Sequence, residues 1–415
     1  MEKKGRKPIF YGWWIVLVAF YAYLVSIGPI SYGTSILSLH IVKEQGWSEG
    51  IIGTGLSVHY LAIALLSVPG GMLIEKKGFR FTLILGALCG IAGYLWMAFA
   101  PVSRAGYLGT FFLVGINAVL CALLGGPGLV NGWFDRRKSL PMSLVLTAGA
   151  AGGFLLPGIS RRLTQIGDRV CWLVYAGMLG VLIVLTLAVV RESPEQVGEL
   201  RDGRDWRMKR GEKTGEEKTT CSPSLKRCYR SGALYIQAIQ AFLSKLICGG
   251  FVSYVVIYAV RRNLPEAQAV MILTVFNVAG LISRLLSGEK DEIPIPENLL
   301  QAASFLLLAC GAGILFLANK PLTFWLGAAV MGGSYGITCI LQVLMLPDYF
   351  GDRNFQNLNG VLNMVAFAGN AAGPLVVFGI ARAFGGYQYA FLALALISLL
   401  CGVLAVYDRV RLLRD

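Results

Sequence analysis

Apolar runs long enough to cross a bilayer recur along the whole of this chain. A helix of about 20 residues crosses a hydrocarbon core of about 30 Å, and runs of this length cover residues 10–32, 51–74, 81–101, 105–131, 140–160, 170–190, 233–260, 266–288, 298–318, 321–346, 357–381 and 387–407. Apolar residues make up 56% of the chain and charged residues only 14%, which excludes a set of soluble domains. We therefore expect an all-α integral membrane protein with twelve transmembrane helices.

One long polar stretch divides the twelve runs into two sets of six. Residues 191–231 are rich in Lys, Arg, Glu and Asp, whereas most other connections are short. We expect a six-helix bundle over 1–190, a solvated linker over 191–231, and a second six-helix bundle over 232–415.

Lys and Arg are distributed unevenly among the loops. With the N-terminus inside, the inside segments hold 26 of these residues and the outside loops hold 9. Cytoplasmic loops carry such an excess, so both termini and the linker are expected in the cytoplasm. The first apolar run is too long for a signal peptide, which indicates an uncleaved first span. The net charge of +14 then reflects topology and attraction to anionic membrane lipid, and nucleic acid is not expected as a partner.

The sequence gives no support for metal, redox or hydrolytic chemistry. Nine Cys are scattered, mostly singly within apolar runs, without the spacing of a zinc site, and only two His occur. Walker and H-E-x-x-H motifs do not occur, and the Gly-x-Ser-x-Gly match at Gly332–Gly336 lies inside an apolar span rather than at the strand-to-helix turn of a hydrolase. We therefore expect neither an enzyme nor a bound metal or cofactor.

Three short motifs recur in the same order in the two halves of the chain. The pairs are Gly71–Arg80 with Gly288–Glu292, Gly125–Gly128 with Gly332–Gly336, and Ala148–Gly153 with Ala368–Pro374. Parallel repeats of this kind build transporters in which one half rocks against the other around a central site.

These motifs carry a family resemblance. The segment Gly71–Arg80 resembles the loop signature of the major facilitator superfamily, with Glu75 in place of the usual Asp. Three further features are similar to the monocarboxylate porters and the oxalate/formate antiporters: Tyr11–Val16, Trp133–Leu140, and Arg284 followed by Gly288. The resemblance covers the whole chain and implies a twelve-helix transporter for a small carboxylate.

Two positions depart from those families. Animal proton-coupled porters have an Asp one turn before the arginine, where this chain has Gly280. Oxalate exchangers pair the arginine with a Lys in the eleventh helix, where this chain offers Asn363 and Asn370. Neither proton coupling nor oxalate exchange therefore follows from the resemblance.

Two basic residues, Lys245 and Arg284, lie inside predicted spans. Lys245 is roughly 18 Å from either end of its helix, too far for its side chain to reach the surface, whereas Arg284 is about one turn from an end. All 23 Asp and Glu fall in loops, tails or helix ends, so no carboxylate is expected at the depth of these cations. A charge there costs about 2.5–3.5 kcal/mol, and an Arg fork can hold both oxygens of a carboxylate. We interpret the two residues as the binding site of an anionic cargo; a structural gate at Arg284 and a hydrated crevice at Lys245 are the alternatives.

Neutral polar residues complete the predicted site. Tyr335 stands in the Gly-rich tenth span, and we expect its hydroxyl to orient the cargo. Other candidates, which could instead join helices by hydrogen bonds, are Tyr32, Asn117, Tyr254 and Gln342. His59 lies about 12 Å into the second span and is a candidate for proton coupling, beside a purely structural role.

The predicted function is secondary active transport of a small monocarboxylate, such as lactate, pyruvate or formate, by alternating access. A dicarboxylate or oxalate-type exchanger is the alternative if both cations bind cargo together. An exporter of larger amphipathic compounds, or a receptor or sensor without transport, are the remaining alternatives. We expect a monomer, as is usual for such folds, and the short tails indicate a prokaryotic inner membrane.

Charged loops on the predicted cytoplasmic side form a separate feature. Glu75 and Arg80 lie in one loop and Asp135, Arg136 and Arg137 in another. We expect these loops to form salt bridges between the two halves rather than to bind cargo.

Overall fold

The structure of the chain is a computed structural model that describes residues 10–30, 37, 41, 44–47, 50–100, 103–135, 138–203, 224–287 and 296–412. The first half contains α1 (Gly12–Gly28), α3 (Gly50–Phe99), α4 (Arg104–Asn117), the π-helical turn η2 (Ala118–Leu123), α5 (Gly125–Trp133), α6 (Ser139–Ile166) and α7 (Asp168–Val189). The short elements η3 (Pro194–Val197), η4 (Arg201–Gly203) and α8 (Leu225–Arg230) follow. The second half contains α9 (Gly232–Arg261), α10 (Glu266–Leu286), α11 (Glu297–Phe316), α12 (Pro321–Phe350), η7 (Asp352–Asn354), α13 (Phe355–Ala383) and α14 (Tyr387–Leu412).

These helices supply the predicted number of spans. Among the described residues, nine helical stretches are long and apolar enough to cross a membrane. One of them, α3, contains two predicted spans, and α1 and the first part of α6 are shorter apolar helices. The chain is therefore an all-α multi-pass membrane protein with the twelve-helix arrangement that the sequence predicts.

A sharp bend at Gly78 separates the two spans within α3. Gly78 has φ 82° and ψ 172°, a backbone conformation that residues with a Cβ rarely adopt. The Glu192 carboxylate accepts the N–H groups of Phe79 at 2.8 Å and Arg80 at 2.9 Å, so donors at the start of the following helix are satisfied. A single glycine with a distant carboxylate thus replaces a longer loop.

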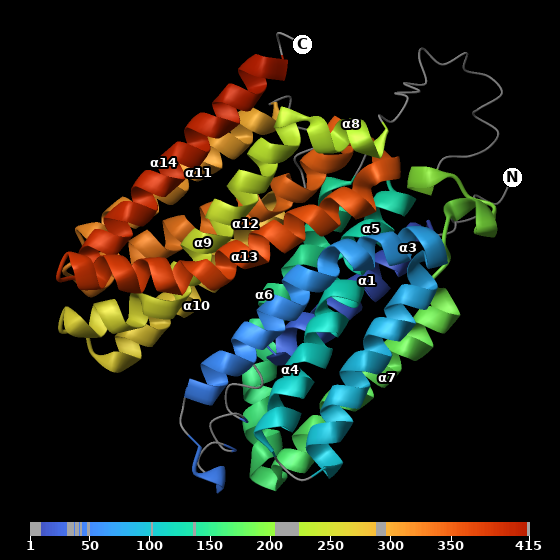
Figure 1. The fold of residues 1–415 in the computed structure, drawn as a ribbon, viewed down its shortest axis with the longest axis horizontal. Helices are drawn as coiled ribbons and strands as arrows, with labels where there is room; N and C mark the ends of the chain where they lie inside the picture. The colour runs from blue at the N-terminus through green and yellow to red at the C-terminus, as the bar shows by residue number, and fades with distance from the viewer. Residues whose placement is uncertain are drawn as a thin grey trace, which may run out of the picture.

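The helices form two bundles, each with its own buried core (Figure 1). Trp133 and Trp172 are among the largest buried side chains of the first bundle, and Phe305 and Phe391 of the second. The two bundles lie side by side near α8 and diverge toward their opposite ends (Figure 1). We call the end that carries residues 191–203 and α8 the linker face.

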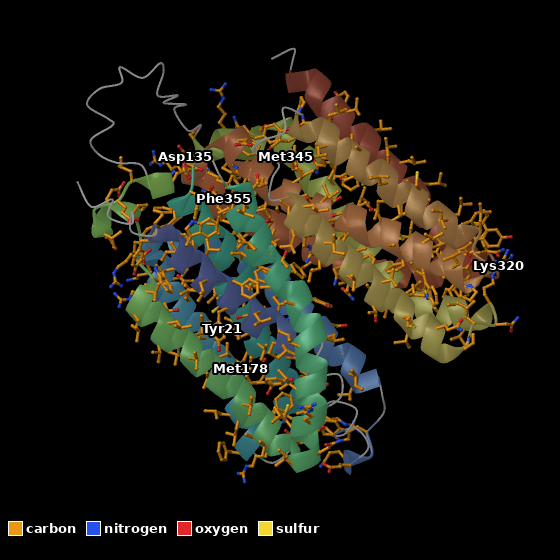
Figure 2. The ribbon with its side chains drawn as sticks, turned by 180° about the vertical axis from the view of Figure 1, so that it is seen from behind. Tyr21, Asp135, Met178, Lys320, Met345 and Phe355 are labelled. Atoms are coloured by element: carbon orange, nitrogen blue, oxygen red, sulfur yellow. The ribbon has the colours of Figure 1, made fainter. Side chains whose placement is uncertain are left out.

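The residues labelled in Figure 2 show which side chains lie at each end of the molecule. Seen from behind, Asp135, Met345 and Phe355 lie at the linker face, and Lys320 lies at the far end of the second bundle (Figure 2). Asp135, Met345 and Phe355 thus mark the end of the molecule where the two bundles lie side by side.

Part of the predicted solvated linker is docked on the first bundle. Trp133 Nε1 donates to the Arg191 carbonyl at 3.2 Å, and the Tyr11 N–H donates to Glu199 at 3.0 Å. The Asp135 N–H donates to Asp202 Oδ1 at 2.9 Å. Carboxylates of the linker thus satisfy backbone N–H groups of the bundle, which a free tether would leave to water.

An ion pair joins the two bundles at the linker face. Asp352, just before α13, accepts Lys138 Nζ at 2.8 Å and Arg201 Nη1 at 2.7 Å. The sequence predicted such a bridge from the neighbouring charged loops, but Arg80 Nη2 donates instead to the Leu187 carbonyl at 2.6 Å within the first bundle. Arg136 and Arg137 lie outside the described residues.

Helices α3 and α13 cross between the bundles at glycines. A Cβ on Gly71 would lie 2.6 Å from the Gln356 carbonyl oxygen, and a Cβ on Gly360 would lie 2.6 Å from the Ser67 carbonyl oxygen. Glycine has no side-chain carbon, so the two backbones can lie closer together here than any other residue would allow.

A second contact between the bundles depends on a proline. Pro127 has no N–H, so the Leu123 carbonyl four residues earlier lacks its α-helical donor. Asn359 Nδ2, from α13, donates to this carbonyl at 3.2 Å. The break in the first bundle is therefore satisfied by the second.

Candidate binding cavity

A cavity of about 270 Å³ lies between the two bundles. The first bundle lines it with α1, α3, η2, α5 and α6, and the second with α9, α10, α12 and α13. Both cations that the sequence predicts within spans, Lys245 and Arg284, line this cavity.

Lys245 projects from α9 toward aromatic side chains. Its Nζ donates to the Tyr335 hydroxyl at 2.7 Å and lies 5.3 Å from the Tyr335 ring centroid and 5.6 Å from that of Phe367. The negative faces of aromatic rings attract an ammonium group, but they do not use its hydrogen-bond donors. An ammonium group has three donors, so most of this one's hydrogen-bonding capacity is available to a bound molecule.

Arg284 projects from the last turn of α10 and reaches across to the first bundle. Its Nη1 donates to the Leu146 carbonyl of α6 at 3.2 Å. Its position follows from close packing of α10 on α12, where a Cβ on Gly336 would lie 2.6 Å from the Gly280 carbonyl oxygen. Arg284 thus lies at a junction between the cavity and the contact of the two bundles.

Carboxamide side chains make up much of the polar lining. Asn277 Nδ2 donates to the Leu273 carbonyl at 2.9 Å, and Gln342 Nε2 donates to Ser244 Oγ at 3.1 Å. Asn363 Nδ2 donates to the Asn359 carbonyl oxygen and side-chain oxygen, both at 3.0 Å. Asn359, Asn363 and Asn370 all line the cavity from one face of α13.

Aromatic rings connect the bundles beside this polar surface. Tyr60 of α3 stacks on Phe367 of α13, with ring centroids 5.9 Å apart, and Phe276 stacks on Tyr335 at 6.0 Å. All four residues line the cavity. The cavity therefore combines apolar ring faces with cations and amides, as small-molecule sites commonly do.

Five of the predicted site residues lie together on this cavity: Lys245, Arg284, Tyr335, His59 and Gln342. Two others do not line it. Asn117 is buried within the first bundle, where its Nδ2 donates to the Gly86 carbonyl at 3.2 Å, and Tyr254 stacks on Tyr387 with ring centroids 5.3 Å apart. Tyr32 lies outside the described residues.

Other residues that line the cavity were not predicted from the sequence, among them Tyr60, Asn277 and Asn359. A signal for Asn277 was available, because it lies seven residues before Arg284 and therefore on the same helical face. Asn359 and Asn363 are likewise one turn apart in a predicted span. Tyr60 carries no comparable signal.

The described charged side chains that line the cavity are all positive. The described residues that line it include Lys245 and Arg284 but no Asp or Glu. Across the part of the chain that the structure describes, no group of three His, Cys, Asp or Glu side chains is placed to hold a metal ion. An anion is the natural ligand of such a surface.

Two helical bundles around a shared central cavity define a membrane transporter built from parallel repeats. A family model described as Major Facilitator Superfamily matches residues 15–374, and the chain belongs to this superfamily. Its members are transporters of small molecules rather than enzymes.

Individual relatives agree with this assignment. The mouse protein named monocarboxylate transporter 11 is 25% identical over 398 residues, which cover 90% of this chain and 82% of the relative. The solved structure of FucP in its outward conformation has a TM-score of 0.71 at 15% identity, covering 95% of this chain and 98% of FucP. The proton:xylose symporter XylE, bound to a brominated glucose, has a TM-score of 0.74 at 14% identity, covering 95% of this chain and 94% of XylE. Both solved structures share the fold of this chain.

Proposed function

We propose that this transporter moves a small monocarboxylate, such as lactate, pyruvate or formate, by alternating access. The observation that carries the proposal is the cavity between the bundles, which two cations line and no Asp or Glu among the described residues does. The name of the mouse relative, monocarboxylate transporter 11, supports the same class of cargo.

The environment of Lys245 favours an anion. A charge at this depth costs about 2.5–3.5 kcal/mol even on the lenient insertion scale. Among the described residues, the Tyr335 hydroxyl is the hydrogen-bond partner of the ammonium group, and a neutral hydroxyl does not balance its charge. A bound carboxylate would balance it, and the planar fork of Arg284 suits the same group.

The contacts at the linker face suggest the state of the transport cycle. The Asp352 ion pairs, the glycine crossing and the Asn359 bond join the bundles at or near that face. The excess of Lys and Arg in the predicted inside segments favours a cytoplasmic linker face. We propose that the chain is closed to the cytoplasm here and faces outward, in a cell membrane.

A dicarboxylate exchanger is the second candidate, because Lys245 and Arg284 line the same cavity. One dicarboxylate could place a carboxylate at each of the two cations, whereas a monocarboxylate has one carboxylate for both. Cargo charge therefore has to be measured rather than assumed.

Uptake into proteoliposomes tests the proposal with Lys245→Gln. Losing a hydrogen bond to a charged group costs about 1.5–3 kcal/mol, so uptake of radiolabelled lactate or pyruvate is expected to fall about 10- to 150-fold. Lys320→Gln, which removes an exposed cation at the far end of the second bundle, is the matched control and should leave uptake unchanged.

Three results test, in turn, the site, the charge of the cargo and proton coupling. Unchanged uptake by a folded Lys245→Gln protein would refute the site. Preference for malonate or succinate over lactate would favour the dicarboxylate exchanger. A gradient of pH that drives uptake in the wild type, but not in His59→Gln, would support proton coupling at His59.

A further inference from the structure

Five carboxamides line the cavity: Asn277, Gln342, Asn359, Asn363 and Asn370. Polar side chains between membrane helices often only join the helices. Asn277 and Asn363 do not serve that purpose, because each amide donates to the carbonyl four residues earlier in its own helix. Their polar ends therefore call for another explanation.

The amide groups offer the cavity unused carbonyl oxygens. Asn277 and Gln342 each donate one N–H to a protein acceptor, and the Asn363 NH₂ group has two protein acceptors. Their carbonyl oxygens accept no hydrogen bond from the described residues, and they do not belong to the buried side-chain atoms left without a partner. These oxygens are therefore accessible acceptors, which a carboxylate would avoid and a hydroxyl group would satisfy.

The acceptors lie within reach of the cations. Asn277 precedes Arg284 by seven residues on α10, which places it about 10 Å away along the same helical face. Asn363 lies one turn from Phe367, whose ring is 5.6 Å from Lys245 Nζ. A molecule whose carboxylate meets the cations would thus extend its remaining atoms along the amide oxygens.

The size of the cavity agrees with a longer molecule. The cavity volume of about 270 Å³ is many times the roughly 10–15 Å³ that one water molecule needs on the same measure. Formate would leave most of this space to water, whereas a longer carboxylic acid would fill more of it.

We infer that the cargo is a polyhydroxylated monocarboxylate, with its carboxylate at Lys245 and Arg284 and its hydroxyl groups donating to Asn277, Gln342 and Asn363. This inference rests on the proposed function and narrows its substrate class. Simple alkyl acids would leave the amide oxygens unsatisfied, which costs binding free energy.

Binding to the purified full-length protein, measured by isothermal titration calorimetry, tests the inference. Propionate, lactate and glycerate share a three-carbon chain and differ in hydroxyl count, and hexanoate and gluconate form a six-carbon pair. Sorbitol supplies the hydroxyl groups without the charge. We expect affinity to rise from propionate through lactate to glycerate, and gluconate to bind at least 10-fold tighter than hexanoate.

Asn277→Leu and Asn363→Leu test the individual acceptors. Both keep the helical N–H donors to Leu273 and Asn359, and Leu favours a helix more than Asn does, so folding should be retained. Each is expected to weaken gluconate binding about 3- to 10-fold more than propionate binding. The matched control is Asn319→Leu, at an exposed amide that accepts from Arg262, and it should change neither.

The outcomes distinguish a failure of the polyhydroxylated cargo from a failure of the proposed anion transport. Equal binding of propionate and glycerate, and of hexanoate and gluconate, would overturn the inference while the proposed anion transport stands. Equal losses of gluconate and propionate in the Leu variants would also overturn it, because the amides would then act on the site as a whole. Binding of sorbitol without binding of any carboxylate would overturn the proposed function, and the inference with it.

Discussion

Neutralising Asp352 is expected to open the linker face. Its carboxylate is shared by Lys138, whose side chain is only 12% exposed, and by Arg201, which is 41% exposed. An exposed ion pair contributes about 0.2–1 kcal/mol and a hydrogen bond to a charged group about 1.5–3 kcal/mol. We assign about 1.5 kcal/mol to Lys138 and about 0.5 kcal/mol to Arg201 on this basis. Asp352→Asn should then shift the equilibrium between closed and open linker face by about 2 kcal/mol, or about 30-fold.

Hydrogen–deuterium exchange measures this opening on the unlabelled protein. Peptides that contain Ser67–Gly71 and Gln356–Gly360 report on the α3–α13 crossing, and peptides from α11 and α14 serve as internal references. Asp352→Asn should speed exchange at the crossing and leave the references unchanged. Lys138→Gln should have a smaller effect, and Arg201→Gln the smallest, at about 2-fold.

Two results would refute this reasoning. Unchanged exchange at the crossing in Asp352→Asn would mean that the ion pairs do not hold the bundles together. A larger effect of Arg201→Gln than of Lys138→Gln would mean that burial does not set the strength of these pairs. Lys320→Gln, at the far end, should match the wild type in every peptide.

Two further predictions concern the contacts beside the ion pairs. Asn359→Leu removes the donor to the Leu123 carbonyl, which should cost about 1–3 kcal/mol and lower the thermal unfolding temperature; adding Pro127→Ala returns the missing helical N–H and should recover part of the loss. A double variant no more stable than Asn359→Leu would contradict this account. Gly360→Ala should reduce transport because its Cβ meets the Ser67 carbonyl oxygen, whereas Gly379→Ala on the same helix, where a Cβ meets nothing within 4 Å, should not; equal transport by the two variants would argue against the crossing.

The number and order of the helices could be predicted from the sequence, because the membrane imposes a fixed length on each apolar run. The structure of the connection between the spans 51–74 and 81–101 could not be predicted as well. Hydropathy marks Glu75–Arg80 as a polar loop, yet the structure makes a nearly continuous helix there, bent at Gly78 and satisfied by Glu192 from beyond the first bundle. That carboxylate is more than a hundred residues away, so local pattern alone does not indicate its role.

The candidate cavity was predictable in its charges and less so in its neutral residues. Lys245 and Arg284 could be placed because burying a charge in a membrane is costly unless it has a function. Asn117 and Tyr254 carry no such cost, and each makes its contact within its own bundle, Asn117 by a hydrogen bond to the Gly86 carbonyl and Tyr254 by stacking on Tyr387. Which way a neutral polar residue faces depends on the rotation of each helix, and helices that are apolar on every side leave that rotation undetermined in the sequence.

Main-chain carbonyl groups supply the first bundle's side of several contacts between the bundles. Asn359 binds the carbonyl of Leu123, Arg284 binds that of Leu146, and Gly360 packs on that of Ser67. Replacing any of these three residues of the first bundle by alanine keeps its carbonyl in place. An alanine scan of the first bundle would therefore detect Lys138 but pass over these three contacts, whereas the same scan of the second bundle would detect two of them, at Asn359 and Arg284.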